Sequence, residues 1–146
     1  MTRSERIRET TPMNTQGARP VPRIEARKAG GKGLGVFAVG PITAGEVIER
    51  APAVVLSPDE TKLIAQTVLK KYYFEWGQEE GDSALVLGCG FLYNHSYQPN
   101  ADYFRNYEGP EIHFVAARDI KDGEEITINY NGFVDNQTEV EFAVLP

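Results

Sequence analysis

Ten residues, Phe91–Asn100 (FLYNHSYQPN), carry the most informative pattern in this sequence. An apolar run, residues 84–90, precedes them, and two asparagines, a histidine, a serine and a proline then crowd into one loop. The Asn94 amide can donate and accept hydrogen bonds, so it suits a ligand that carries both an ammonium and a carboxylate group. The same residue types also build turns. Asn94 and Asn100 as turn residues, and His95 as a hydrogen-bonded structural histidine, therefore remain an open alternative.

Two other segments, one on each side of this loop in the chain, carry candidate functional residues. Gly33-Leu34-Gly35 would let backbone approach a ligand closely, although these glycines taken alone indicate a tight turn rather than a binding site. A dinucleotide fingerprint is excluded here, because the third glycine and the crossover helix are missing. Segment 125–130 (EITINY) alternates apolar and polar residues, which predicts a half-buried strand. It ends at Tyr130, and a tyrosine in such a place is often part of a core.

Taken together, the order and spacing of these segments resemble those of the SET-domain protein lysine methyltransferases, over about residues 21–132. Gly33–Gly35 matches the family's first motif. Asn94–Ser96 with Pro99–Asn100 matches its central motif, and Glu125–Tyr130 matches its final strand, which ends in the family's essential tyrosine. The resemblance implies a mainly β, SET-type fold of several small sheets. It also implies a short helical insert and a knot-like C-terminal core, in which the last strand passes beneath the Asn94 loop.

The resemblance also implies an activity, namely transfer of a methyl group from S-adenosylmethionine to a lysine amine in a protein or peptide, with histone tails the family's usual substrate. Tyr130 would be the catalytic residue, orienting the reacting groups and contacting the cofactor. The other cofactor-binding residues that it implies are Lys32, Gly33, Leu34, Gly35, Asn94 and His95. The residues that it implies for the substrate channel are Tyr103, Ile128, Phe133 and Tyr73. For Tyr73 and for Trp76, a weaker candidate, a place in the core is the competing interpretation.

The sequence departs from the family pattern at three places. Tyr97 stands where the central motif usually has cysteine, and Ile128-Asn129 stands where the last motif often has Phe-Asp. No cysteine follows Tyr130 to build the zinc segment that closes the lysine channel in many relatives. Phe133 or Phe142 of the tail, or a partner subunit in a homodimer, would have to supply that wall.

The cysteine and histidine content limits the other kinds of site that this chain can form. A single cysteine, Cys89, excludes an internal disulfide or a multi-cysteine zinc cluster within this chain. His95 and His113 are the only histidines and lack a metal-ligand spacing, so no metal site is predicted. Cys89, between two glycines, is interpreted as a small buried residue rather than a nucleophile.

The formal net charge of −6 argues against a general phosphate-binding surface, so no nucleic acid is expected to bind. Two acidic clusters are interpreted as solvated faces and turns, or alternatively as the rim of a site for a lysine-rich peptide: Glu75, Glu79, Glu80 and Asp82, and then Asp119, Asp122, Glu124 and Glu125. No apolar run approaches the ~18–20 residues of a membrane helix, and the start lacks a secretory signal. An intracellular protein is expected, cytoplasmic, or nuclear if eukaryotic or viral.

One domain is expected. Residues 1–20 would form a flexible tail, 21–132 the SET domain with a helical insert at about 57–83, and 133–146 a C-terminal tail near the substrate channel. Ser57 and Glu60 form a capping-box pattern that predicts a helix to about Leu69, with Ile64 and Val68 on one face. The predicted strands are 21–26, 36–39, 47–50, 53–56, 72–76, 125–130, and a pair formed by 103–107 and 112–116.

Three competing functions remain. The main alternative is a non-catalytic, SET-like module that binds peptides by strand addition. A β-rich structural domain would use the glycines and asparagines only for turns. A hydrolase is poorly supported, since neither a metal site nor an activated nucleophile is visible.

Overall fold

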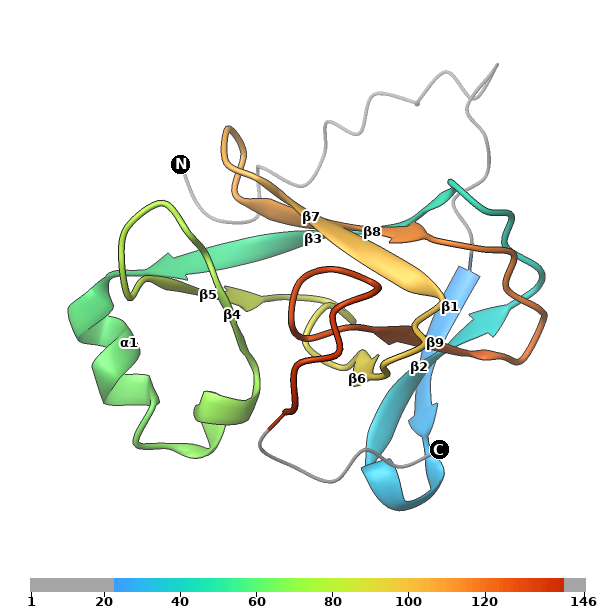
Figure 1. Cartoon of the computed structure of the whole chain (residues 1–146), viewed down its shortest axis with the longest axis horizontal. Helices are drawn as coiled ribbons and strands as arrows, with labels where there is room; N and C mark the ends of the chain where they lie inside the picture. The colour runs from blue at the N-terminus through green and yellow to red at the C-terminus, as the bar shows by residue number, and fades with distance from the viewer. Residues whose placement is uncertain (1–22, 141–146) are drawn as a thin grey trace, which may run out of the picture.

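The computed structural model describes residues 23–140, so the expected N-terminal tail and Phe142 lie outside the described residues (Figure 1). Nine strands in this range form two sheets. The four-stranded sheet has the order β1 (Arg23–Lys28), β2 (Leu34–Val39), β9 (Glu125–Ile128), β6 (Asn94–His95). The five-stranded sheet has the order β4 (Tyr73–Glu75), β5 (Ser83–Val86), β3 (Val47–Leu56), β8 (Glu111–Ala116), β7 (Ala101–Asn106). The mainly β fold of small sheets that the sequence predicts is confirmed.

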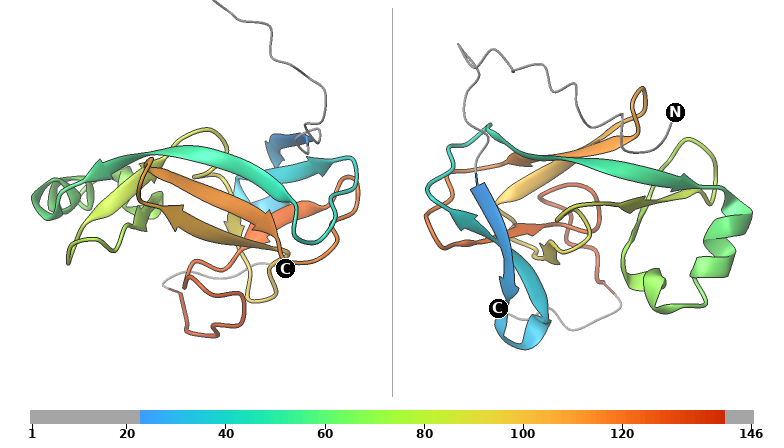
Figure 2. Two further views of the ribbon diagram at one scale, coloured as in Figure 1. Left: turned by 90° about the horizontal axis from the view of Figure 1, so that it is seen from above. Right: turned by 180° about the vertical axis from the view of Figure 1, so that it is seen from behind.

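Helical segments are short and lie between strands. The 3₁₀ turn η2 (Gly30–Lys32) joins β1 to β2, and α1 (Pro58–Ile64) and the 3₁₀ turn η3 (Val68–Lys71) join β3 to β4. Helix α1 and the β1–β2 hairpin lie on opposite sides of the molecule along its long axis, with β6 between them and β9 beside β2 (Figures 1 and 2). Within residues 23–140, no helix has the length and hydropathy needed to span a bilayer.

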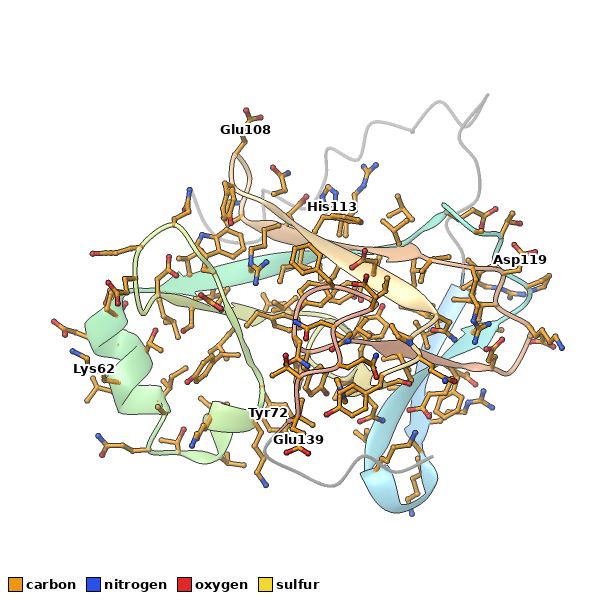
Figure 3. All side chains as sticks on the ribbon, viewed as in Figure 1. Lys62, Tyr72, Glu108, His113, Asp119 and Glu139 are labelled. Atoms are coloured by element: carbon orange, nitrogen blue, oxygen red, sulfur yellow. The ribbon has the colours of Figure 1, made fainter. Side chains whose placement is uncertain are left out.

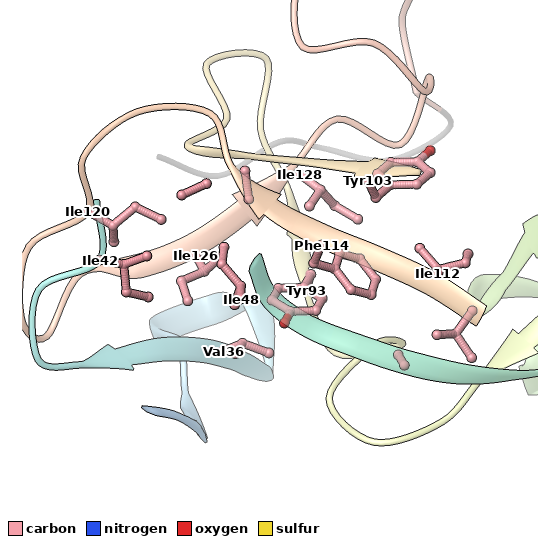
Figure 4. Close-up of a cluster of buried hydrophobic side chains, with 14 of the residues drawn as sticks. Val36, Ile42, Ile48, Tyr93, Tyr103, Ile112, Phe114, Ile120, Ile126 and Ile128 are labelled. Carbon is pink, nitrogen blue, oxygen red and sulfur yellow. The ribbon is translucent and has the colours of Figure 1, made fainter. Parts of the chain in front are cut away.

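The core fills the space between the two sheets with side chains from alternate strand positions (Figure 4). Ile112 and Phe114 of β8 and Ile126 and Ile128 of β9 have no exposed surface. The ring of Tyr93 packs on Phe114 with centroids 4.3 Å apart. Period-two alternation thus places the apolar sides of β8 and β9 in this core.

Strand β3 (Val47–Leu56) differs from the prediction made from the sequence. The sequence predicts two short strands, 47–50 and 53–56, but the chain forms a single ten-residue strand. Its first half pairs with β8 and its second half with β5, and the change of partner falls at Pro52. Because proline has no N–H to donate, it is tolerated where the ladder is exchanged. The Pro52 carbonyl still accepts a bond from Leu87 N at 2.8 Å.

The predicted helix begins where expected but ends early. Both hydrogen bonds of the Ser57–Glu60 capping box are present, yet α1 stops at Ile64 rather than near Leu69. The Thr67 hydroxyl donates to the Ile64 carbonyl at 2.7 Å and accepts from Leu69 N at 3.1 Å. This local competition ends the helix and starts η3. Val68 is 69% exposed, so it does not continue an apolar face.

The pairing of β7 with β8 is confirmed, but β9 is shorter than predicted. It ends at Ile128, and the alternation that would have buried Tyr130 ends with it. Asn129 is 2% exposed instead, since its amide donates to the Asn136 carbonyl. Tyr130 as a whole is 39% exposed.

Asn100 provides a test of how β9 is held. Its amide donates to the Glu125 carbonyl at 2.8 Å and accepts from Thr127 N at 2.9 Å, inside the fold. We expect Asn100→Ala to lower the free energy of unfolding by roughly 2–4 kcal/mol, because both backbone groups lose their partner. Urea unfolding followed by circular dichroism measures this loss. Asn106→Ala, at the end of β7 where the side chain accepts a long 3.3 Å bond from Glu108 N, is the control and should change stability by less than about 0.5 kcal/mol. Equal effects of the two substitutions would contradict this account.

Candidate functional site

The central feature of the site is the parallel pairing of β6 with β9. Asn94 lies opposite Thr127 and His95 opposite Ile128, and Ser96 N donates to the Ile128 carbonyl at 2.9 Å. Parallel neighbours run in the same direction, so the chain that leaves β6 and the chain that leaves β9 emerge at the same edge. The loop after Asn94 and the residue Tyr130 are thereby brought together.

Both ends of Tyr130 are fixed by residues of the Asn94 loop region. Its backbone N–H donates to His95 Nδ1 at 3.0 Å, and its phenol donates to the Tyr93 carbonyl at 2.6 Å. Burial lowers the pKa of His95, which keeps the imidazole neutral and able to accept this bond. The Tyr130 phenol therefore has a defined direction, although the residue lies beyond the end of β9.

The glycine turn joins the same site through Asn94. The Asn94 amide donates to the Leu34 carbonyl at 3.0 Å and to Glu125 Oε1 at 2.8 Å. The other Glu125 oxygen pairs with Lys32 Nζ at 2.8 Å, and both side chains of this pair are 18% exposed. An ammonium, a carboxylate and an amide thus lie in one half-buried cluster.

Two glycines explain why this cluster fits. At Gly35, an added Cβ would lie 2.7 Å from Glu125 Oε1 and 2.9 Å from both Asn94 Nδ2 and Ala29 Cβ, so no side chain can be accommodated. At Gly33, no atom lies within 4 Å of the equivalent position and φ is +78°. This backbone is open to a neighbour and adopts a conformation that glycine allows at little cost.

A cavity of about 800 Å³ extends from Tyr130 to the helical insert. Its aromatic lining comprises Tyr72, Tyr73, Phe74, Phe91, Tyr93, Tyr103 and Tyr130. Glycines and charged or other side chains complete the wall: Lys70, Lys71, Glu75, Gly90, Arg105, Asn131, Gly132, Glu139 and Val140. Tyr72 at the end of η3 and Glu139 from the C-terminal segment approach this cavity from different elements (Figure 3). A space of this size, with aromatic side chains on much of its wall and charged groups among them, suits a small-molecule or side-chain site.

Three phenols of the cavity, those of Tyr93, Tyr103 and Tyr130, have a raised pKa. Burial, followed by the nearby Tyr72 and Glu125, raises the pKa of Tyr130 to about 12. Burial also raises the pKa of Tyr103 and, together with the Glu49 carboxylate, that of Tyr93. These groups can donate hydrogen bonds and exclude water, but none of them supplies a phenolate near pH 7.

Comparison with known proteins identifies the family. The SET domain family model matches residues 33–131, which include all three motifs. The chain belongs to the SET-domain family. Its predicted resemblance to histone-lysine methyltransferases is thus confirmed at the level of the family.

Individual proteins that are similar to this SET domain include histone methyltransferases. A Schizosaccharomyces pombe histone-lysine N-methyltransferase, named as specific for H3 lysine-37, is 37% identical over 108 residues, 73% of this chain and 72% of the relative. A Plasmodium falciparum protein named as a histone methyltransferase superposes with a TM-score of 0.56 and 30% identity, covering 74% of this chain and 96% of that one. A chain of the Chaetomium thermophilum Polycomb Repressive Complex 2 superposes with a TM-score of 0.63 and 25% sequence identity, covering 77% of this chain but 16% of that one.

The structure brings most of the predicted site residues together in the SET domain. Lys32, Gly35 and Asn94 meet at Glu125, and Leu34 takes part through its carbonyl. His95 contacts the backbone of Tyr130. Of the predicted channel residues, Tyr73 and Tyr103 line the cavity.

Two predicted channel residues do not line this cavity. Ile128 has no exposed surface and packs in the core, because it belongs to the inward-facing side of β9. Phe133 is 72% exposed, since the turn after Tyr130 directs it to solvent. Trp76 is 1% exposed and belongs to the core, as the competing interpretation held.

Several site residues were not assigned a role from the sequence. Glu125 was grouped with a solvated acidic cluster, yet it connects Lys32 and Asn94. The signal available was its place as the first residue of the final motif. Tyr72 and Phe91 were missed because long-range packing, not local pattern, brings them to the cavity.

Other acidic residues mainly stabilise turns. Asp82 accepts bonds from the backbone of residues 77–79. Asp122 accepts from Gly40 N and Asp119 from Ala44 N, each at 2.8 Å. For these three carboxylates, the turn interpretation holds.

Glu49 supports the site from the adjacent sheet. Its carboxylate accepts from Cys89 N and from the Tyr93 phenol, both at 2.9 Å. Burial, and then the Glu49 charge, raise the pKa of the Cys89 thiol, which disfavours the reactive thiolate. Residues 89–93, and hence the carbonyl that orients Tyr130, are thereby anchored to β3.

Gly35→Ala tests the cluster directly. The new methyl group would displace the Asn94 amide and the Glu125 carboxylate, so we expect binding of S-adenosylmethionine to weaken by about 10-fold or more. Isothermal titration calorimetry measures the affinity, and circular dichroism checks the fold. Gly109→Ala is the matched control, because it has open space and no positive φ. Unchanged affinity in folded Gly35→Ala would show that the cluster does not contact the cofactor.

Proposed function

We propose that this SET domain is a protein-lysine N-methyltransferase that uses S-adenosylmethionine and acts on a lysine in a basic, histone-like segment. The observation that carries the proposal is the orientation of Tyr130. Its phenol lines the cavity and is fixed at 2.6 Å from the carbonyl of Tyr93, the residue that precedes Asn94 and its polar cluster. A directed hydroxyl beside an aromatic cavity suits the alignment of two reacting groups.

The residues present fit the cofactor. The methionine end of S-adenosylmethionine carries an ammonium and a carboxylate. Glu125 and Lys32 offer the opposite charges, and Asn94 can bind either group. Gly33 leaves its backbone open for close approach. These residues, with the backbone of Leu34 and His95, would hold the cofactor beside β2, β6 and β9, outside the residues that line the aromatic cavity.

When bound, the cofactor supplies a methyl group on a positively charged sulfur. The chain itself has to bring a lysine amine into line with that methyl group and keep water out. Tyr103 and Tyr73 would line the path of the lysine side chain. The Tyr130 hydroxyl, held by Tyr93, would orient the amine at the point of transfer.

The lysine amine must lose its proton before it can react, although free lysine has a pKa near ~10.4. With a pKa of about 12, the Tyr130 phenol is a poor base near neutral pH, so it is assigned a role in orientation. The aromatic rings of the wall disfavour the charged ammonium by desolvation, and the sulfur charge would do so by repulsion. The amine proton would then leave to solvent.

The preference for a basic substrate has two supports. The chain carries a net charge of −6, which favours the approach of a lysine-rich segment. The Schizosaccharomyces pombe relative is named for a lysine of histone H3. A histone H3 tail is therefore the first substrate to test.

The first test is methyl transfer by Tyr130→Phe. The wild-type protein, labelled S-adenosylmethionine and histone peptides should give labelled lysine. The variant should lose activity by on the order of 10²-fold, because the orienting hydroxyl is absent. Its cofactor affinity by calorimetry should stay within about 2-fold. Cofactor binding without transfer to any lysine by the wild type would favour the non-catalytic module instead.

The pH profile tests the protonation assignment. Between pH 7 and 9, kcat/KM should rise by about tenfold per pH unit, as the substrate amine loses its proton. No plateau should appear in this range, since the pKa of Tyr130 is raised to about 12. A plateau near pH 8 that disappears in Tyr103→Phe would contradict the assignment and identify a titrating phenol. Circular dichroism at each pH checks that the protein remains folded.

A further inference from the structure

Residues 131–140 form one wall of the cavity without belonging to a helix or strand. Asn131 and Gly132 lie near the start of this segment and Glu139 and Val140 at its end, and all four line the cavity. Because this segment lacks ladder hydrogen bonds, its position depends on side-chain contacts. Those contacts decide the shape of this wall.

Asparagine side chains fold the segment back on itself. The Asn129 amide donates to the Asn136 carbonyl at 2.6 Å, and the Asn131 amide donates to the Thr138 carbonyl at 2.6 Å. The Asn136 amide returns a bond to the Asn131 carbonyl at 3.3 Å. This cluster closes the loop, but every partner in it lies within residues 129–138.

Tyr97 ties the far end of the segment to the rest of the fold. Its phenol oxygen accepts a bond from Val140 N at 3.0 Å, and its carbonyl accepts from Gln137 Nε2 at 3.1 Å. Its ring stands edge-on to the His95 ring, with centroids 4.6 Å apart and planes at 89°. His95 in turn accepts from Tyr130 N. One side chain therefore connects the cavity wall to the histidine that holds Tyr130.

We infer that Tyr97 is a positioning residue that holds residues 137–140 against the cavity, so that Glu139 and Val140 form part of the substrate-binding wall. This inference rests on the proposed function for its effect on turnover. Tyr97 itself does not line the cavity. Its effect should thus fall on substrate binding, whereas the contacts of Tyr130 with Tyr93 and His95 remain.

Tyr97→Phe isolates this contact. The variant keeps the ring against His95 and the carbonyl that accepts from Gln137, but it removes the acceptor for Val140 N–H. One such hydrogen bond corresponds to roughly a 3- to 10-fold change in an equilibrium. Tyr107→Phe is the matched control, because it also removes a phenol–backbone bond, to the Trp76 carbonyl, from a residue that does not line the cavity.

Two measurements are made on the full chain. Amide hydrogen exchange at residues 137–140 should speed up by roughly 3- to 10-fold in Tyr97→Phe and stay unchanged in Tyr107→Phe. In the methylation assay, KM for a histone peptide should rise by a similar factor, while kcat and cofactor affinity stay within about 2-fold. Gln137→Ala, which removes the second contact, should give the same pattern and serves if Tyr97→Phe fails to fold.

Unchanged exchange at residues 137–140 would overturn the anchoring role, whatever the activity. Faster exchange with an unchanged KM would overturn the role in substrate binding. A wild-type protein that transfers no methyl group would overturn the proposed function and the KM effect with it. The exchange arm would still decide, independently of activity, whether Tyr97 holds the segment.

Discussion

The parallel contact between β6 and β9 is the constraint on which the site depends. Two short stretches, far apart in the chain, align so that Asn94 lies opposite Thr127 and His95 opposite Ile128. With β6 only two residues long, backbone pairing alone is a weak link. The bond from Tyr130 N to His95 Nδ1 extends it by one side chain and fixes where the chain goes after β9. A neutral imidazole is needed for that bond, and burial of His95 maintains it.

Hydrogen bonds from polar side chains hold these short strands and turns in place, a role that backbone pairing has in longer strands. Asn100 pairs with the backbone of β9, Asn94 links the glycine turn to Glu125, and Asn129 draws the segment after Tyr130 inward. A buried amide is costly unless its donors and acceptors are satisfied. Each of these amides therefore fixes the position of the segment to which it is hydrogen-bonded. Gly35 and Asn94, on one side of the site, belong to paired strands, whereas a segment without regular structure closes the other side.

The sequence predicted the parts that depend on local pattern. The capping box at Ser57, the pairing across the 108–110 turn and the inward side of β9 follow from short-range chemistry. Other features could not be read locally. The end of α1 was decided by a single threonine hydroxyl, and the continuity of β3 by an exchange of pairing partners at Pro52.

In the candidate site, too, some residues follow from local sequence pattern and others from long-range packing. Motif spacing located Gly35, Asn94 and Tyr130, but the cavity wall comes from Tyr72, Phe91 and Val140, whose neighbours are set by tertiary packing. Phe133 illustrates the limit, because an aromatic residue close to Tyr130 in the chain lies 72% exposed. An apolar side chain after a strand end carries no information about which way the following turn directs it.

The central claim is that the glycine turn, the Asn94 loop and Tyr130 form one binding site. Titration of labelled protein with S-adenosylmethionine, followed by amide chemical shifts, tests it most directly. The account predicts that the amides of residues 33–35, 94–95 and 130 shift together and fit a single Kd. Shifts confined to one of these segments, or different affinities among them, would contradict it.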